Sequence, residues 1–182
     1  MDVFSEIKTR ADLASLLGVK ESTLTYLLYK VPEVDKYTSF SLPKRNGGTR
    51  EISSPIRGLK AIQRRLAEVL LEAYPNRPCV HGFLSGKNVK TNASVHLNRK
   101  WIANIDIKDF FPSIHFGRVM GLFKSLPFCL PDQLAREIAN ICCKDGVLPQ
   151  GAPTSPIISN YICWRLDNQL QQLAKGARCV YT

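Results

Sequence analysis

The residues with the clearest chemical potential lie in the apolar stretch between Trp101 and Ile114. Alternation from Trp101 to Lys108 predicts a strand, and this strand would place Asp106 among side chains suited to burial. A carboxylate in such a position is costly unless something compensates it, and Mg²⁺ prefers oxygen ligands of this kind. The pattern therefore predicts a metal-binding carboxylate at Asp106, with an edge strand that carries a solvated Asp as the alternative.

Basic residues are gathered in two windows that precede Asp106 in the sequence. The formal net charge of the chain is +10. Residues 44–65 hold seven basic side chains and one acidic side chain, whereas residues 87–100 hold four basic side chains and no acidic one. Charge gathered in this way is typical of a surface that binds a polyanion, most simply nucleic acid. A solvated basic face is the alternative interpretation.

Composition limits the classes of protein to which the chain can belong. Its 182 residues, 45% of them hydrophobic, are enough for one good core or two small ones. No apolar run approaches the roughly 20 residues of a membrane helix, and the first ten residues contain no signal-peptide core. The six cysteines form no Cys-x-x-Cys pair, so we expect reduced, mostly buried thiols in a cytosolic protein without a membrane partner.

The first 30 residues predict two short helices separated by Gly18. Thr9 is suited to cap the first helix and Asp12 to stabilise its first turn. The pair resembles a helix-turn-helix, but its second helix, residues 21–30, has no Arg, Asn or Gln with which to read base edges. We therefore favour a structural or docking role, and a DNA-binding regulator is the alternative.

Residues 38–55 predict a β-hairpin, because Asn46-Gly47 is a strong turn signal within alternating sequence. An amphipathic helix over residues 59–73 follows, with basic side chains on its polar side. Residues 79–100 are expected to form a loop before the strand that carries Asp106.

The remaining residues predict three helices and the start of a strand. The first helix begins at Pro112 and the second at Pro131; the first buries Val119, Leu122, Phe123 and Leu126, and the second buries Leu134, Ile138 and Ile141. A rigid turn over residues 147–156 leads into the third helix, which Ser155 caps and Gly176 ends. Its expected buried stripe is Ile158, Ile162, Leu166, Leu170 and Leu173. Residues 178–182 are expected to begin a strand.

Taken together, these segments resemble a bacterial retron reverse transcriptase from about Ala11 to the last residue. No single motif is specific, but the ordered set is, and the Asn-Ala-x-x-His pattern separates it from group II intron and retroviral enzymes. The motifs are Lys44 to Arg50, Ile56 to Gln63, His81-Gly82-Phe83, Asn92-Ala93-Ser94-Val95-His96, Asp106 to Ile114 and Leu148 to Pro156.

The resemblance implies an α+β fold with the fingers and part of the palm of a right-hand polymerase. A small helical element would occupy residues 1–35, the fingers residues 36–100, and the partial palm residues 101–182.

The resemblance also implies roles for individual residues at a nucleotide site. Asp106 and the carbonyl of Ile107 would be ligands in a two-metal Mg²⁺ site that this chain supplies only in part. Phe111 would be the steric gate that selects deoxynucleotides, although Phe110 or plain core packing are alternatives. The remaining nucleotide-binding residues would be Lys44, Arg50, Gln150 and Gly151.

Other residues are implied to contact nucleic acid. Lys60, Arg64 and Arg65 would bind template phosphates, while Asn92 and His96 would be RNA-binding or structural. Asp109 is expected to form a salt bridge or to support the metal site rather than to bind metal. The three histidines, His81, His96 and His115, have spacing that matches no common metal site.

The function implied is RNA-directed DNA synthesis with Mg²⁺ in the bacterial cytoplasm. The template and primer would be a structured non-coding RNA, the substrates dNTPs, and the product RNA-linked single-stranded DNA. By family analogy, an effector protein would be a partner in defence against phage. A non-catalytic nucleic-acid-binding protein and another bacterial reverse transcriptase, such as a group II intron enzyme, are the alternatives.

One departure from the family pattern matters for activity. The sequence contains no Tyr-Ala-Asp-Asp tetrad, which would supply further metal-binding carboxylates, and it ends at Val180-Tyr181-Thr182. A fragment, half of a split polymerase and a naturally short RNA-binding protein are the three explanations. We prefer the fragment, because an end within a strand would leave an exposed sheet edge, and we expect the 182-residue chain alone to be inactive.

Overall fold

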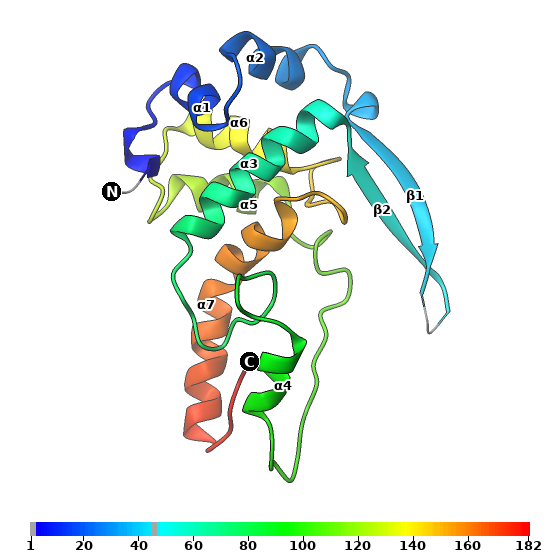
Figure 1. Ribbon diagram of the computed structural model, residues 1–182, viewed down its shortest axis with the longest axis vertical. Helices are drawn as coiled ribbons and strands as arrows, with labels where there is room; N and C mark the ends of the chain where they lie inside the picture. Colours follow the sequence, from blue (N-terminus) through cyan, green and yellow to red (C-terminus); the bar gives the residue numbers. More distant parts are fainter. Residues whose placement is uncertain (1–2, 45–46) are drawn as a thin grey trace.

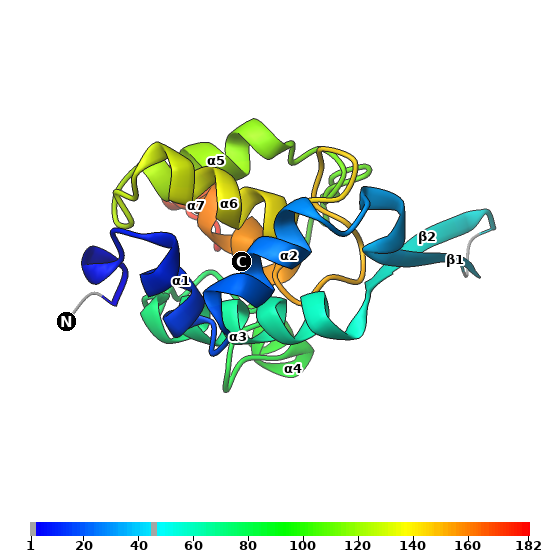
Figure 2. The ribbon, with the colours of Figure 1, turned by 90° about the horizontal axis from the view of Figure 1, so that it is seen from above.

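A computed structural model describes residues 3–44 and 47–182, so that Arg45 and Asn46 of the expected hairpin turn lie outside the described residues. A helical body carries a hairpin that projects from one side (Figures 1 and 2). The elements, in chain order, are η1 Val3–Glu6, α1 Arg10–Leu16, α2 Glu21–Tyr29, η2 Glu33–Asp35, β1 Tyr37–Pro43, β2 Thr49–Pro55, α3 Arg57–Ala73, α4 Val89–Val95, α5 Phe116–Lys124, α6 Asp132–Cys142 and α7 Ser155–Gly176.

The two N-terminal helices form as expected, and their local signals explain why. The Thr9 hydroxyl accepts from the Asp12 backbone N–H, and the Asp12 carboxylate accepts from the Thr9 N–H at 2.7 Å. This capping box satisfies donors that a helix start leaves unpaired. Leu13 of α1 and Leu24 of α2 are then completely buried in the helical body.

The hairpin and the helix that follows it are also confirmed. Strands β1 and β2 pair antiparallel, with Tyr37 opposite Pro55 and Pro43 opposite Thr49. Helix α3 begins at Arg57, with Ile56 at its N-cap position, and runs across the body in Figure 1. Its predicted apolar stripe is buried at Leu59, Ile62, Leu66, Val69 and Leu70, whereas Ala73, at the end of the helix, is exposed.

Helices α5 and α6 form a packed pair, but the first of them starts later than expected. Helix α5 begins at Phe116, not at Pro112, because residues 108–113 form turns. Leu126 lies beyond its end and is 83% exposed, so its predicted burial is wrong. Helix α6 begins next to Pro131 and buries its predicted stripe of Leu134, Ile138 and Ile141.

Helix α7 ends at Gly176 as predicted, but Ser155 does not cap it. Ser155 is already inside the helix, and its hydroxyl donates to the Pro149 carbonyl at 2.7 Å. Thr154 occupies the cap position without a side-chain capping bond. The serine therefore ties the helix start to the preceding turn, although the helix begins where the sequence places it.

The predicted apolar stripe of α7 is only partly buried. Ile158 is fully buried, Ile162 and Leu170 are partly buried, and Leu166 and Leu173 are 41% and 70% exposed. Figure 1 shows the reason, because the second half of α7 extends beyond the other long helices. Burial of a helix face depends on what it meets as well as on its own periodicity.

Two other predictions need correction. Residues 79–100 contain the short helix α4, whose start is capped by Asn88 with Thr91 at its third position. Residues 178–182 form no strand; they lie beside α4 in Figure 1 and pair with no other strand among the described residues. An extended segment becomes a strand only when a neighbour completes its backbone hydrogen bonds.

The core of the molecule is a single cluster of buried apolar residues that extends from Phe4 to Tyr161. All six cysteines are free thiols; three are buried, whereas Cys129 and Cys179 are exposed. Among the residues that the structure describes, no helix has the length and apolar character required to cross a membrane.

Candidate active site

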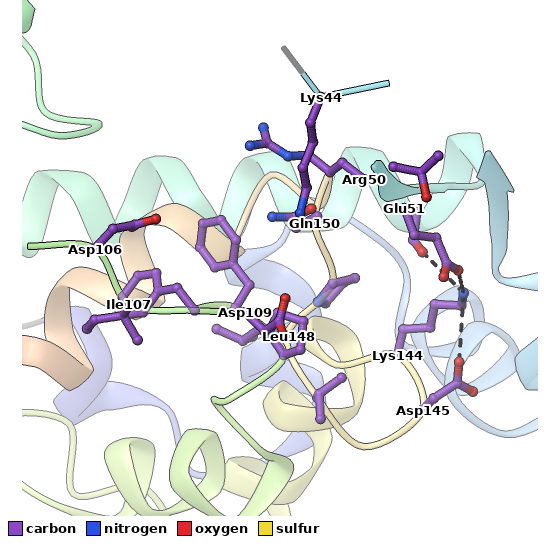
Figure 3. A pocket seen from close by; sticks show the side chains of 17 residues that line it. Lys44, Arg50, Glu51, Asp106, Ile107, Asp109, Lys144, Asp145, Leu148 and Gln150 are labelled. Atoms are coloured by element: carbon purple, nitrogen blue, oxygen red, sulfur yellow. Dashed lines mark hydrogen bonds and ion pairs between the residues drawn. The ribbon is translucent and has the colours of Figure 1, made fainter. Parts of the chain in front are cut away.

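A pocket of about 440 Å³ lies beside the hairpin, along residues 49–53 of β2 (Figure 3). Three separate segments meet there: the hairpin, the turns around residues 106–112, and the loop between α6 and α7. The residues that line it are Lys44, Thr49, Arg50, Glu51, Ser53, Asp106, Ile107, Asp109, Phe110, Phe111, Pro112, Lys144, Asp145, Val147, Leu148, Pro149 and Gln150.

The pocket brings together most of the residues that the sequence predicts for metal and nucleotide binding. Six of the seven line it, namely Lys44, Arg50, Asp106, Ile107, Phe111 and Gln150. The seventh, Gly151, follows Gln150 directly. Their roles stay predictions, but side chains up to 106 positions apart in the sequence share one cavity.

The segment that carries Asp106 is not the predicted strand. Residues 101–107 have no regular secondary structure, and Trp101 and Ile105 are 84% and 91% exposed. In the described chain the only sheet is β1 with β2, so nothing pairs with this segment. Alternating apolar residues favour a strand, but they do not replace the partner that a strand requires.

The hairpin brings basic side chains to the rim of the pocket. The Lys44 N–H donates to the Gly48 carbonyl at 3.0 Å, which continues the ladder beyond Pro43 and Thr49. Figure 3 shows the Lys44 side chain directed toward Gln150, with Arg50 beside it. Arg50 suits phosphate binding, because its planar guanidinium can donate two parallel hydrogen bonds.

The Gln150-Gly151 turn lies directly against β2. The Ser53 N–H donates to the Gln150 carbonyl at 2.7 Å. A Cβ atom at Gly151 would lie 2.9 Å from both the Ile52 Cγ2 and the Ser53 carbonyl oxygen, and the φ of Gly151 is +110°. Only glycine fits this close approach without strain.

The two phenylalanines after Asp109 both line the pocket. The ring centroids of Phe110 and Phe111 are 5.5 Å apart with 43° between the ring planes, and both side chains also pack partly against the core. The geometry therefore leaves both as candidates for a steric gate. Asp109 has a φ of 50°, a backbone conformation that few residues other than glycine adopt.

Sequence reasoning missed Lys144 and the turn that carries it. The Lys144 ammonium donates to the Ser39 hydroxyl at 2.8 Å and to the Ser53 hydroxyl at 3.1 Å. It also lies 3.8 Å from a Glu51 carboxylate oxygen and 3.7 Å from one of Asp145. The available signal was the Asp145-Gly146 dipeptide, which is typical of a tight turn between short extended segments.

The predicted phosphate-binding residues of α3 lie outside the pocket. Arg64 is exposed and Lys60 is half-buried. Arg65 donates through Nε to the Leu16 carbonyl at 3.3 Å and pairs with Glu68 at 3.4 Å. Arg65 therefore also joins α3 to the end of α1.

Asn92 and His96 lie one turn apart on and after α4, away from the pocket. The Thr182 hydroxyl donates to Asn92 Oδ1 at 2.6 Å and lies 2.8 Å from His96 Nε2. Nearby, His81 Nδ1 lies 3.0 Å from the Thr91 hydroxyl, and burial, with the charge of Lys87, lowers the pKa of His81. The side chains of Asn92 and His96 thus both contact Thr182 in this structure, while RNA binding by them stays a prediction.

The donor set in the pocket suits Mg²⁺ only in part. The Asp106 carboxylate and the Ile107 carbonyl are hard oxygen donors of the type that Mg²⁺ prefers. Within residues 3–44 and 47–182, no group of three or more His, Cys, Asp or Glu side chains is arranged to hold a metal ion. Substrate phosphates and further carboxylates would have to complete the coordination.

Comparison with known proteins adds an independent finding. A family model described as "Reverse transcriptase (RNA-dependent DNA polymerase)" matches residues 42–181. The chain is 37% identical to the retron Mx65 reverse transcriptase and 35% identical to the retron Mx162 reverse transcriptase, both from Myxococcus xanthus, over 96% and 98% of its length. It is 32% identical to the retron Ec86 reverse transcriptase from Escherichia coli over 94% of its length.

These matches cover 45%, 40% and 53% of the three relatives, so the chain spans about half the length of the curated relatives it matches. The resemblance to retron reverse transcriptases and the predicted α+β class are confirmed.

Proposed function

The chain belongs to the reverse transcriptase family, and from this premise we propose that it contributes the nucleotide site of an RNA-directed DNA polymerase. The observation that supports this most directly is the shared pocket of Asp106, Phe111, Gln150 and the basic residues of the hairpin. These are the residue types that a dNTP site requires: a carboxylate, an aromatic wall and cations for the triphosphate. Templated DNA synthesis is the reaction class that fits all of them.

The basic side chains at the rim would hold the triphosphate of the incoming nucleotide. Arg50 would bind phosphate oxygens bidentately, and the Lys44 ammonium would add a mobile positive charge. Because both residues belong to the hairpin, its position relative to Gln150 decides how well they reach the phosphates.

The opposite side of the pocket would select the sugar. An aromatic ring at Phe111 or Phe110 would exclude a ribose 2′-hydroxyl by steric conflict. The Gln150-Gly151 turn would support the nucleotide, because Gly151 allows the backbone to approach β2 closely.

Asp106 and the Ile107 carbonyl would hold Mg²⁺ together with substrate oxygens. Bound there, Mg²⁺ would lower the pKa of the primer 3′-hydroxyl and neutralise charge on the phosphates. Because residues 1–182 offer one carboxylate of this set, we propose that they do not extend a primer by themselves.

Nucleic acid would follow the basic surfaces on either side of the pocket. Template phosphates would be contacted by Lys60, Arg64 and Arg65 of α3. RNA would be contacted by Asn92 and His96 once it replaces Thr182 as their hydrogen-bond partner. The phosphate contacts would position the strand and carry no sequence information.

The biological role is proposed from the relatives, which are named retron reverse transcriptases. The template and primer would be a structured non-coding RNA, and the product would be RNA-linked single-stranded DNA. An effector protein of an anti-phage defence system would be the further partner.

Primer extension by the complete gene product tests the proposal. Purified protein is given a primed RNA template, dNTPs and Mg²⁺, and the variant Asp106→Asn is compared with Asp132→Asn. Asp132 is an exposed carboxylate that pairs with Lys124 at 2.9 Å, outside the pocket. We expect Asp106→Asn to lose on the order of a thousandfold in rate and the control to keep it. Equal rates for the two variants would contradict the proposal.

Ribonucleotide incorporation then separates the two phenylalanines. Phe111→Ala should increase the use of rNTPs relative to dNTPs by about tenfold or more, because the cavity it leaves admits a 2′-hydroxyl. Phe110→Ala is the matched control, since its ring lines the same pocket. The opposite ranking would transfer the gate to Phe110.

A further inference from the structure

We infer that Lys144 is a positioning residue that fixes the β1–β2 hairpin against the Gln150-Gly151 turn and thereby sets the nucleotide contacts of Arg50. This inference rests on the proposed function for its kinetic consequence, whereas its structural part stands on contacts in the described residues.

Lys144 is held on a rigid turn. Lys144 and Val147 exchange backbone hydrogen bonds of 2.9 and 3.0 Å around Asp145 and Gly146, whose φ values are 50° and 77°. Positive φ at both central residues is the conformation that Asp-Gly favours in tight turns. The Gly146 carbonyl also accepts from the Phe116 N–H at 2.7 Å, which fixes the turn to the start of α5.

The Lys144 ammonium reaches both strands of the hairpin at one rung. Ser39 and Ser53 are directly opposite in the ladder, and their hydroxyl oxygens lie 3.2 Å apart. Lys144 donates to both of them, at 2.8 and 3.1 Å. Figure 3 shows its chain directed toward Glu51, with Asp145 on the other side. The donors of the ammonium are therefore directed at the protein rather than at the open pocket.

Ser53 connects Lys144 to the proposed nucleotide site. Its side chain accepts from Lys144, while its backbone N–H donates to the Gln150 carbonyl at 2.7 Å. Its carbonyl oxygen is one of the two atoms that a Cβ at Gly151 would meet at 2.9 Å. One buried serine thus connects the lysine, the turn and the strand that carries Arg50.

The hairpin depends on such an anchor because it projects from the body with exposed faces (Figure 2). An isolated two-stranded hairpin is marginally stable in water. A small rotation at its base moves Lys44 and Arg50 at the rim, and a displacement of about 1 Å is enough to weaken a site substantially.

The test is steady-state dNTP incorporation by the complete gene product with Lys144→Met, Lys144→Arg and the double variant Ser39→Ala/Ser53→Ala. We expect Lys144→Met and the double serine variant each to raise KM for dNTP by about tenfold, with kcat changed less than about threefold. Lys144→Arg should restore KM to within about threefold, because a guanidinium can donate to both hydroxyls. Lys124→Met is the control, since this lysine pairs with Asp132 on the surface.

A second measurement keeps this inference distinct from the proposed function. Hydrogen exchange of peptides covering residues 49–55 should be faster in Lys144→Met than in the unaltered protein, and unchanged in Lys124→Met. If Lys144→Met raises KM but the serine variant does not, Lys144 contacts the nucleotide directly and the positioning role is overturned. If the unaltered protein extends no primer, the proposed function fails and exchange alone decides: faster exchange supports the anchor, and equal exchange overturns it.

Discussion

The helical body buries its apolar side chains, whereas the segment of residues 101–107, which carries Asp106, leaves its apolar side chains exposed. In the body, Leu66 of α3 and Ile138 of α6 have no exposed surface. In the segment, Ile105 is 91% exposed and its backbone pairs with no strand among the described residues. An α-helix forms its backbone hydrogen bonds within itself and needs only a surface against which to pack, whereas a strand needs a neighbouring strand to form its backbone hydrogen bonds. Apolar side chains of similar type are therefore buried in the helices but exposed in the unpaired segment.

One substitution made in both regions gives the largest expected contrast. Ile138→Ala should lower the free energy of unfolding by about 2–5 kcal/mol, because it removes buried methyl groups and leaves a cavity. Ile105→Ala should change it by less than about 0.5 kcal/mol. Urea unfolding followed by circular dichroism measures both. A loss at Ile105 comparable to that at Ile138 would mean that the segment is packed.

The contrast also explains which elements could be predicted from sequence. Helix α1 follows from its capping box and its apolar stripe, helices α2, α3 and α6 follow from their apolar stripes, and the hairpin follows from its turn dipeptide, so local signals sufficed. The strand expected at residues 101–108 does not form, and local sequence could not show this, because a strand depends on a partner elsewhere in the chain. The exposed half of α7 was mispredicted for a related reason, since periodicity does not reveal where the neighbouring helices end.

The candidate site shows the same division. Asp106, Arg50 and Gln150 could be named because their motifs carry recognisable residue types in a recognisable order. Lys144 could not, because its partners Ser39 and Ser53 precede it by 105 and 91 positions and nothing local marks the contact. Only the folded arrangement shows that the lysine reaches both strands.

The two N-terminal helices are fixed to the body through one buried carboxylate. Arg10 of α1 and Tyr29 of α2 both donate to Glu137 of α6, whose side chain is 1% exposed. Burial alone would raise the pKa of Glu137, but hydrogen bonds from Arg10 and Gln133 bring it below its ordinary value of 4.5. The unfolded chain then binds the proton more readily. The contribution to stability is complete above about pH 4.5 and is lost as the pH falls through the lower folded value.

Glu137→Gln should therefore cost about 1–3 kcal/mol at pH 7 and flatten the decline in stability below about pH 5. The cost is below that of a fully buried pair, because the Arg10 side chain is 22% exposed. Urea midpoints measured from pH 3 to 7 provide the test. The control is Glu68→Gln, which removes an exposed pair with Arg65 and should change stability by less than about 0.5 kcal/mol. An unchanged acid limb in Glu137→Gln would show that other carboxylates govern acid unfolding.

The smallest expected change in stability comes from removing a helix cap, and two caps of the same type can be compared. Thr9 caps α1 and Asn88 caps α4, and each forms a capping box with the residue three positions later. Helix α1 buries Leu13, whereas α4 buries none of its residues. Thr9→Ala should therefore lower the global free energy of unfolding by about 1 kcal/mol.

Asn88→Ala should leave the global free energy of unfolding nearly unchanged and speed hydrogen exchange within α4 alone, because an unburied helix can open locally without exposing the core. If both caps affected global stability equally, α4 would be coupled to the core as tightly as α1, and the contacts of Asn92 and His96 with Thr182 would be the way in which that coupling is made.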